Sequence, residues 1–179
     1  AYASNECAEE ALQLFRKLQK SDIEPRISHY ISALDACGTV CNLEEGKLLH
    51  LHVSNRGFMS DIRIGNALIS MYSKCGALND ACTVFDSMQE HDVVSWNALI
   101  LAYAIEGEGN KALERIHQME SEDICPTAAT FICTLKACGN IGAIEKAGEI
   151  HAEIERKGLV DMVIGNALVT MYSRCGLLA

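Results

Sequence analysis

The feature that most restricts the fold of this chain is a segment that occurs twice. The segment "GNALISMYSKCG" at 65–76 returns as "GNALVTMYSRCG" at 165–176, with nine of the twelve positions identical. The correspondence extends further, because "YISALDACGTVCNLEEGKLLH" at 30–50 resembles "FICTLKACGNIGAIEKAGEIH" at 131–151. A match that keeps almost the same separation along the chain indicates internal repetition.

A shorter period lies inside the long one, because "NALI" at 66–69 recurs at 97–100. This period predicts one repeat array with four complete units between two partial ones. The units span 1–26, 27–61, 62–92, 93–127, 128–161 and 162–179.

Each unit is expected to form two helices. In the third unit, Ile64, Leu68, Met71 and Tyr72 follow the spacing of one helical face. We expect a glycine to end the first helix of every unit: Gly38, Gly76, Gly107, Gly139 and Gly176. A single helical hairpin cannot bury its own apolar face, so the repetition predicts an all-α solenoid of stacked helix-turn-helix repeats with a continuous core.

The composition narrows the class of protein. The chain is 49% hydrophobic and carries nine cysteines without a C-x-x-C pair, which favours a packed domain in a reducing compartment over a disulfide scaffold. No apolar run approaches the roughly 18 residues that a membrane span needs, so we expect no membrane partner. The chain starts and stops within the repeat pattern, and we expect it to be part of a longer protein whose targeting peptide lies elsewhere.

The units resemble pentatricopeptide repeats. "VVSWNALILAYAIEGEGNKALERIHQMESEDICPT" at 93–127 is similar to the standard unit, "LKACGNIGAIEKAGEIHAEIERKGL" to the long variant and "IGNALISMYSKCGALNDACTVFDSMQEHD" to the short one. Alternation of these P, L and S units resembles the PLS subclass of plant organelle proteins. The resemblance implies a right-handed α-solenoid superhelix that binds single-stranded RNA at roughly one base per repeat. It further implies localisation in a chloroplast or mitochondrion and a part in C-to-U editing or RNA processing.

The resemblance also implies which residues select the base. One residue lies in the opening turn of the first helix, and the other is the last residue of the same repeat. The first group is Asn66, Asn97 and Asn166, and the second is Asp92 and Thr127. By the family's pattern, Asn66 with Asp92 favours U, and Asn97 with Thr127 favours a pyrimidine. An alternative is that these asparagines only cap their helices.

The long units depart from this pattern. They carry Ile31 and Ile132 at the first place, with Asp61 and Asp161 at the second. Isoleucine cannot bond to a base edge, so base reading by these two repeats stays open. The residues expected to flank a base are Arg63, Val94 and Val163, with Ser28 and Ala129 as weaker equivalents.

The net charge of −9 argues against nucleic acid unless the charge is unevenly placed. The expected first helices sum to +3, so the remaining segments carry −12, and the acidity is expected mostly on the outer wall, which the resemblance assigns to the second helices. Lys74, Lys136 and Arg174 occupy late positions in first helices and are candidates for phosphate contact. The alternative is that they are ordinary cations favoured by the helix dipole.

No catalytic or metal site is predicted, and no cofactor is implied. "HAE" at 151–153 has the H-x-E spacing of zinc deaminases, but the required P-C-x-x-C is missing. We expect Cys37, Cys75, Cys138 and Cys175 to pack between helices. The competing functional class is a protein–protein scaffold. In that case the long units, through Ile31 and Ile132, would dock organellar editing-factor proteins.

Overall fold

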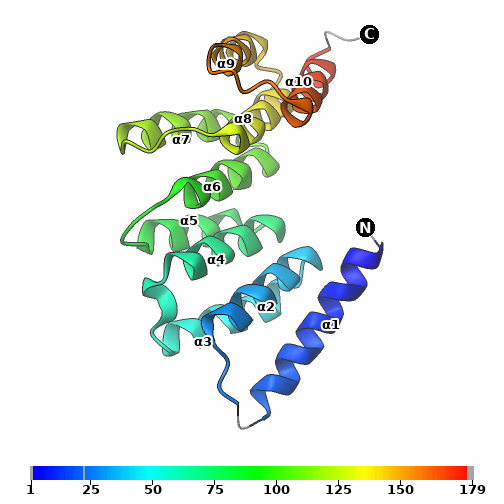
Figure 1. Cartoon of the computed structure of the whole chain (residues 1–179), viewed down its shortest axis with the longest axis vertical. Helices are drawn as coiled ribbons and strands as arrows, with labels where there is room; N and C mark the ends of the chain where they lie inside the picture. The colour runs from blue at the N-terminus through cyan, green and yellow to red at the C-terminus, as the bar shows by residue number, and fades with distance from the viewer. Residues whose placement is uncertain (1, 22, 177–179) are drawn as a thin grey trace. The chain divides into compact units, whose positions relative to one another are not determined.

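The structure is a computed structural model that describes residues 2–21 and 23–176. Within these ranges it contains α-helices, one 3-10 turn and no strand, so the all-α prediction is confirmed. The last three residues of the predicted sixth unit, together with residues 1 and 22, lie outside the described residues. The helices, labelled in Figure 1, are α1 (Tyr2–Gln19), α2 (Ile27–Thr39), α3 (Leu43–Asn55), α4 (Ile62–Lys74), α5 (Leu78–Ser87), α6 (Val93–Ile105), α7 (Gly109–Ser121), α8 (Ala128–Ile141), α9 (Ile144–Arg156) and α10 (Met162–Arg174).

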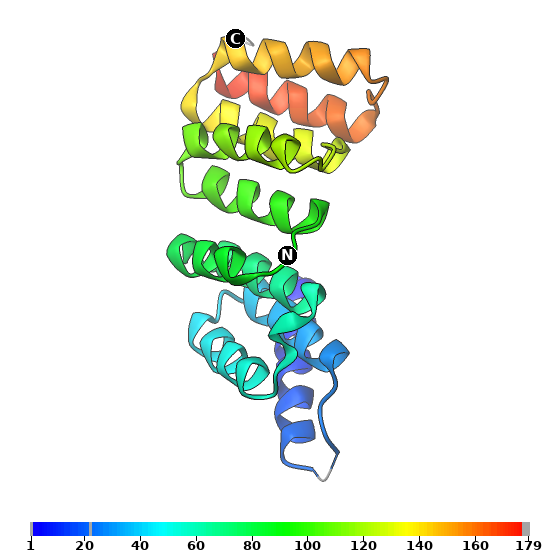
Figure 2. The ribbon, with the colours of Figure 1, turned by 90° about the vertical axis from the view of Figure 1, so that its left-hand side faces the viewer.

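The helices form two compact parts of the chain, which we call unit 1 (up to residue 91) and unit 2 (from residue 92). Each of them contains several of the repeat units that the sequence predicts. In unit 1, α2 packs against α1, α3 and α4, and α5 packs against α4. In unit 2, α8 packs between α6 and α10, while α7 and α9 lie beside it in a second layer. Consecutive helices are antiparallel, so α6, α8 and α10 all begin on the same side of unit 2 (Figure 2). The stacking of helical hairpins within each unit is therefore as the repetition predicts.

The core of unit 1 and that of unit 2 each lie between the packed helices of neighbouring hairpins. In unit 1, the ring of Tyr30 meets the rings of Phe15 and Phe58 edge-on, at centroid distances of 5.2 and 5.9 Å. These contacts join α1, α2 and the short 3-10 turn at Phe58–Ser60. In unit 2, apolar side chains of α8, α9 and α10 form one buried cluster, which includes Phe131 and Ile164. Each hairpin thus buries its apolar face only by sharing it with the next.

The prediction that a glycine ends every first helix is wrong for the two long units. Gly76, Gly107 and Gly176 do take positive φ after their helices. In the long units the left-handed residue is instead Cys41, with φ of 53°, and its equivalent Gly142, with φ of 66°. The expected glycines, at 38 and 139, lie inside α2 and α8.

These two helical glycines allow the next first helix to approach closely. A Cβ atom built on Gly38 would lie 3.2 Å from the Cα atom of Met71 in α4. A Cβ atom on Gly139 would lie 3.3 Å from the Cα atom of Met171 in α10. Real Cβ atoms rarely come so near to a backbone atom, so glycine is needed here for helix packing rather than for a turn.

Candidate nucleic-acid interface

The residues predicted at the second base-selecting place all stand directly before a first helix, as its N-cap. Asp61 Oδ1 accepts from Arg63 N at 2.9 Å, and Asp161 Oδ1 accepts from Ile164 N at 2.8 Å. Asp92 Oδ1 accepts from two backbone N–H groups, those of Val94 and Ser95. Thr127 precedes α8 and donates its backbone N–H to Thr130 Oγ1 at 3.0 Å. The three aspartate side chains therefore stabilise their helices whether or not they contact a base.

The asparagines do not cap. Asn66, Asn97 and Asn166 are each the fifth residue of their helix, α4, α6 and α10. A cap stands before the first helical residue, so the alternative that explained these asparagines by capping is wrong. Isoleucines occupy the same fifth position in the long units, where Ile31 and Ile132 are half-buried.

Asn97 has an unusual environment in unit 2. Its Oδ1 atom is buried and has no hydrogen-bond partner among the described residues. Leaving a buried amide oxygen unpaired costs free energy that a donor could recover. Asn97 lies near the start of α6, and Thr127 directly precedes the neighbouring parallel helix α8. The two predicted selectors of one base thus stand at the same ends of adjacent helices.

The predicted flanking residues are the second residues of their helices and are exposed to solvent. Val94 and Val163 are 52% and 57% exposed, so their apolar side chains project into solvent at the starts of α6 and α10. Ser28 and Ala129 are exposed at the equivalent places in α2 and α8. This exposure leaves both valines accessible to the face of a base.

Arg63 differs from these valines because it folds back onto its own N-cap. Its guanidinium donates to both carboxylate oxygens of Asp61, at 3.0 and 2.7 Å. The hydrogen bonds from Arg63 hold the pKa of Asp61 below its usual value. Asp61 is therefore an anion already paired with a cation from its own helix.

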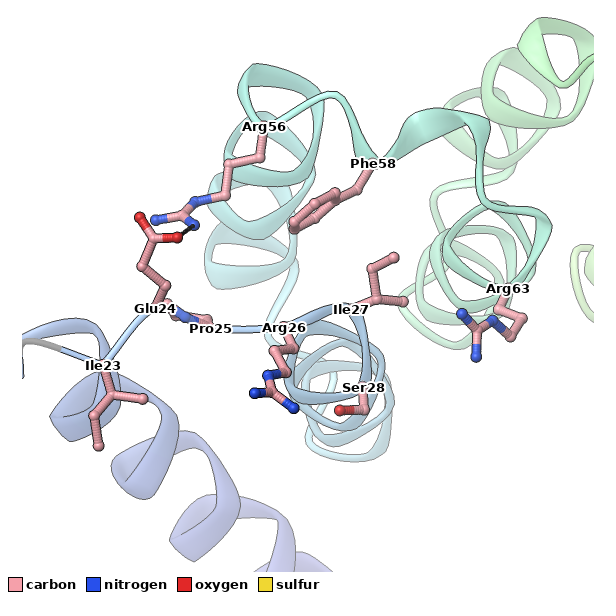
Figure 3. A pocket seen from close by; sticks show the side chains of 9 residues that line it. All are labelled: Ile23, Glu24, Pro25, Arg26, Ile27, Ser28, Arg56, Phe58 and Arg63. Carbon is pink, nitrogen blue, oxygen red and sulfur yellow. Dashed lines mark ion pairs between the residues drawn. The ribbon is translucent and has the colours of Figure 1, made fainter.

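Figure 3 shows a pocket of about 700 Å³ at the starts of α2 and α4 in unit 1. Three arginines line it: Arg26, Arg56 and Arg63. Arg56 pairs with Glu24 at 3.9 Å, the interaction drawn in the figure. The sequence prediction missed Arg26 and Arg56. The alignment of Arg26 with Thr127 at the 101-residue offset is a sequence signal that could have found it, and the structure places Arg26 at the N-cap of α2.

The three candidate phosphate contacts have different surroundings. Lys74 Nζ lies 2.6 Å from Asp35 Oδ1 on α2. Arg174 donates through Nη1 to Asn140 Oδ1 on α8. Lys136 is exposed on α8, and no ion pair engages it in the part of the chain that the structure describes. The sequence predicts the same role for all three residues, whereas the structure shows that their side-chain partners differ.

The histidine of the H-x-E sequence has a structural contact. His151 Nδ1 lies 3.0 Å from the Tyr172 hydroxyl oxygen, and His50 makes the same contact with Tyr72. Among the described residues, no group of three or more His, Cys, Asp or Glu side chains is arranged to hold a metal ion. No described helix has the length and apolar character needed to cross a membrane.

The cysteines expected to pack do so. Cys37 and Cys138 are fully buried, and Cys75 and Cys175 approach them from the next first helix, with Sγ 3.9 and 4.0 Å from the Cys37 and Cys138 carbonyl oxygens. Burial raises the pKa of Cys37 to about 12 and that of Cys138 to about 11. Thiols with such pKa values are protonated and poor nucleophiles at neutral pH.

The chain is similar to known repeat proteins. Residues 91–140 match the model described as "PPR repeat family", and residues 1–23 and 66–93 match that described as "PPR repeat". Two relatives from Arabidopsis thaliana are pentatricopeptide repeat-containing protein CRR2, chloroplastic, and pentatricopeptide repeat-containing protein At1g56690, mitochondrial. They are 38% and 36% identical over 87% and 93% of this chain, which covers 24% of each relative.

The fold is also shared with a solved structure. The crystal structure of the maize pentatricopeptide repeat protein PPR10 in complex with an 18-nt psaJ RNA element superimposes with a TM-score of 0.78 and 20% identity. The superposition covers 89% of this chain and 24% of PPR10. The family models, the relatives and the fold agree, and the chain belongs to the pentatricopeptide repeat family.

Proposed function

We propose that the chain binds single-stranded RNA as the recognition region of a longer organellar RNA editing or processing factor. The observation that carries the proposal is the recurrence of Asn66, Asn97 and Asn166 at the fifth residue of their helices, where they do not cap. Asparagine offers both a donor and an acceptor to the edge of a base. PPR10, which shares the fold, was solved in complex with RNA.

In unit 2, Asn97 and Thr127 select one base, and Val94 and Val163 pack against bases as flanking residues. Among the described residues no donor holds the Oδ1 of Asn97, so a base can compete for this amide without breaking a hydrogen bond of that oxygen. Asn66 selects a base from unit 1, and by the family's pattern its partner is Asp92. We also propose that the repeats are P, L and S repeats and that the protein belongs to the PLS subclass. Relatives named chloroplastic and mitochondrial support localisation in one of these organelles.

The proposal is tested by titrating the chain with short single-stranded RNAs that differ at one base. Asn97→Ala should weaken binding and remove the preference for a pyrimidine at the base opposite the fourth repeat unit, 93–127. Asn110→Ala is the matched control, because Asn110 is exposed on α7 in the second layer. Binding that is equal for all four bases at that position, before and after Asn97→Ala, would refute base selection.

A second candidate function, docking of an editing-factor protein, is favoured by exposed apolar residues on the first long unit. Leu48 and Leu51 are 54% and 56% exposed on α3. Their equivalents on α9 are Glu149 and Ala152, so this patch occurs on one long unit alone. Changing both leucines to serine should abolish capture of a purified editing-factor protein while leaving RNA affinity unchanged. Loss of RNA affinity instead would argue against separate docking.

A further inference from the structure

The chain contains the same pair of helices twice, and the two copies differ in charge. Helix α4 packs on α2 in unit 1, and α10 packs on α8 in unit 2. Lys74 of α4 aligns with Arg174 of α10, so both copies carry a cation near the end of the second helix of the pair. At the facing place on the first helix, Asp35 of α2 aligns with Lys136 of α8. One copy therefore pairs opposite charges where the other places two cations.

In unit 1 the cation is neutralised within the protein. The aliphatic stem of Lys74 crosses α2 at Gly38, where a Cβ atom would lie 2.9 Å from its Cδ. This approach brings Nζ to 2.6 Å from Asp35 Oδ1. The carboxylate occupies the position that an oxygen of a bound anion would take. A ligand phosphate would have to compete with Asp35 for Lys74.

In unit 2 the equivalent cation is held by a neutral group. The stem of Arg174 crosses α8 at Gly139, where a Cβ atom would lie 3.4 Å from its Cδ. Its Nη1 donates to Asn140 Oδ1, and Asn140 Nδ2 donates in turn to the Ala104 carbonyl oxygen at 2.6 Å. This bond uses one of the five N–H donors of the guanidinium and leaves its charge uncompensated.

A groove of about 300 Å³ lies between α8 and α10 and is lined by both Lys136 and Arg174. Its walls are otherwise apolar or neutral, with Ile132 and Met171 among them, and no described residue that lines it is acidic. Asn166, one of the predicted base selectors, stands at the same groove. Two cations over a partly apolar groove match the phosphate and ribose of a nucleic-acid backbone.

We propose that the α8–α10 groove binds a backbone phosphate of single-stranded RNA through Lys136 and Arg174. In unit 1 the equivalent place is closed by the Lys74–Asp35 ion pair. This inference rests on the proposed RNA binding and specifies where the backbone is anchored. Of the three cations that the sequence predicts as phosphate contacts, Lys136 and Arg174 bind the phosphate in this proposal and Lys74 does not.

Reciprocal charge exchanges test the proposal. Lys136→Asp gives unit 2 the arrangement of unit 1, and Asp35→Lys gives unit 1 the arrangement of unit 2. The measurement is the affinity for a short oligouridine at several salt concentrations. For a single strand, the logarithm of the binding constant falls with the logarithm of salt concentration by about 0.7 per phosphate contact. Lys136→Asp should therefore reduce the slope by about 0.7 or more, and Asp35→Lys should increase it by a similar amount.

Control variants change the net charge equally at exposed positions that do not line the groove. Lys17→Asp on α1 is the control for Lys136→Asp, and Glu114→Lys on α7 is the control for Asp35→Lys. Slopes that shift no more for the exchanges than for these controls would overturn the phosphate site while leaving RNA binding intact. A wild-type chain that binds no oligouridine at low salt would instead refute the proposed function. Binding of a polyglutamate peptide that depends on Lys136, without such dependence for oligouridine, would also overturn the proposal.

Discussion

His50 Nδ1 lies 2.9 Å from the hydroxyl oxygen of Tyr72, and the contact joins the second helix of one hairpin to the first helix of the next. The two rings meet edge-on with centroids 5.8 Å apart. His151 and Tyr172 repeat both the hydrogen bond, at 3.0 Å, and the ring geometry in unit 2. This pair accounts for the histidine that recurs in the long units, because it ties neighbouring hairpins together.

Removing the hydroxyl group should therefore destabilise the fold. Tyr72→Phe keeps the ring but leaves the half-buried His50 without this partner, which should cost about 1–2 kcal/mol of unfolding free energy. The midpoint of urea denaturation measures the effect. His50→Phe combined with Tyr72→Phe should cost less than the sum of the single changes, and strict additivity would show that the contact contributes nothing.

Stability should depend on pH through His50. Burial lowers the pKa of this imidazole below its ordinary value of 6.5. The unfolded chain then binds the proton more readily than the folded chain, so the unfolding free energy should be highest above pH 6.5 and should decrease as the pH falls below it. Denaturation at a series of pH values from 7.5 to about 5.5 measures this slope. His50→Gln should flatten it, and an unchanged slope would exclude His50 as the source.

The N-cap role of Asp92 can be separated from its proposed role with a base. Asp92→Asn retains a side-chain oxygen that accepts from the Val94 and Ser95 N–H groups, whereas Asp92→Ala removes it. We expect Asp92→Ala to cost about 1 kcal/mol of stability and Asp92→Asn to cost much less. If Asp92 selects a base, Asp92→Asn should nevertheless change the preference for U. A stable Asp92→Asn variant with unaltered preference would limit this residue to capping.

The helices could be predicted from the sequence because apolar spacing and helix-starting residues are local signals. The partners of Lys74 and Arg174 could not, because they depend on how closely α4 and α10 cross the glycines of α2 and α8. The alignment of the two copies does show one relevant difference, because Asp35 corresponds to Lys136, which has the opposite charge. The sequence assigns Gly38 and Gly139 to turns because glycine is favoured after a helix and unfavourable inside one, and only the backbone shows that these two lie within helices.

In each long repeat unit, the residue with left-handed backbone conformation that follows the first helix allows a reciprocal test. Cys41 adopts φ of 53°, which is unfavourable for a residue with a Cβ atom, whereas its equivalent is Gly142. Cys41→Gly should raise the unfolding free energy by up to about 1 kcal/mol, and Gly142→Ala should lower it by about 1 kcal/mol. Denaturant midpoints of the two variants measure both changes. A Cys41→Gly variant less stable than wild type would show that the 3.4 Å contact of the Cys41 thiol with the Lys74 carbonyl oxygen outweighs the backbone strain.

Two glycines inside helices should respond to alanine in opposite ways. At Gly148 on α9 a Cβ atom would meet nothing within 4 Å, so Gly148→Ala should gain about 0.5–1 kcal/mol from the better helix propensity of alanine. At Gly38 the same gain is opposed by a contact of 3.2 Å with the Met71 backbone, and α4 must move to relieve it. Overpacking of this kind costs about 1–3 kcal/mol, so Gly38→Ala should be destabilising overall. The displacement should also lengthen the Lys74–Asp35 ion pair, because the Lys74 stem crosses the same glycine. Denaturation midpoints of the two variants compare these effects, and equal stabilisation by both would mean that α2 and α4 do not pack through Gly38.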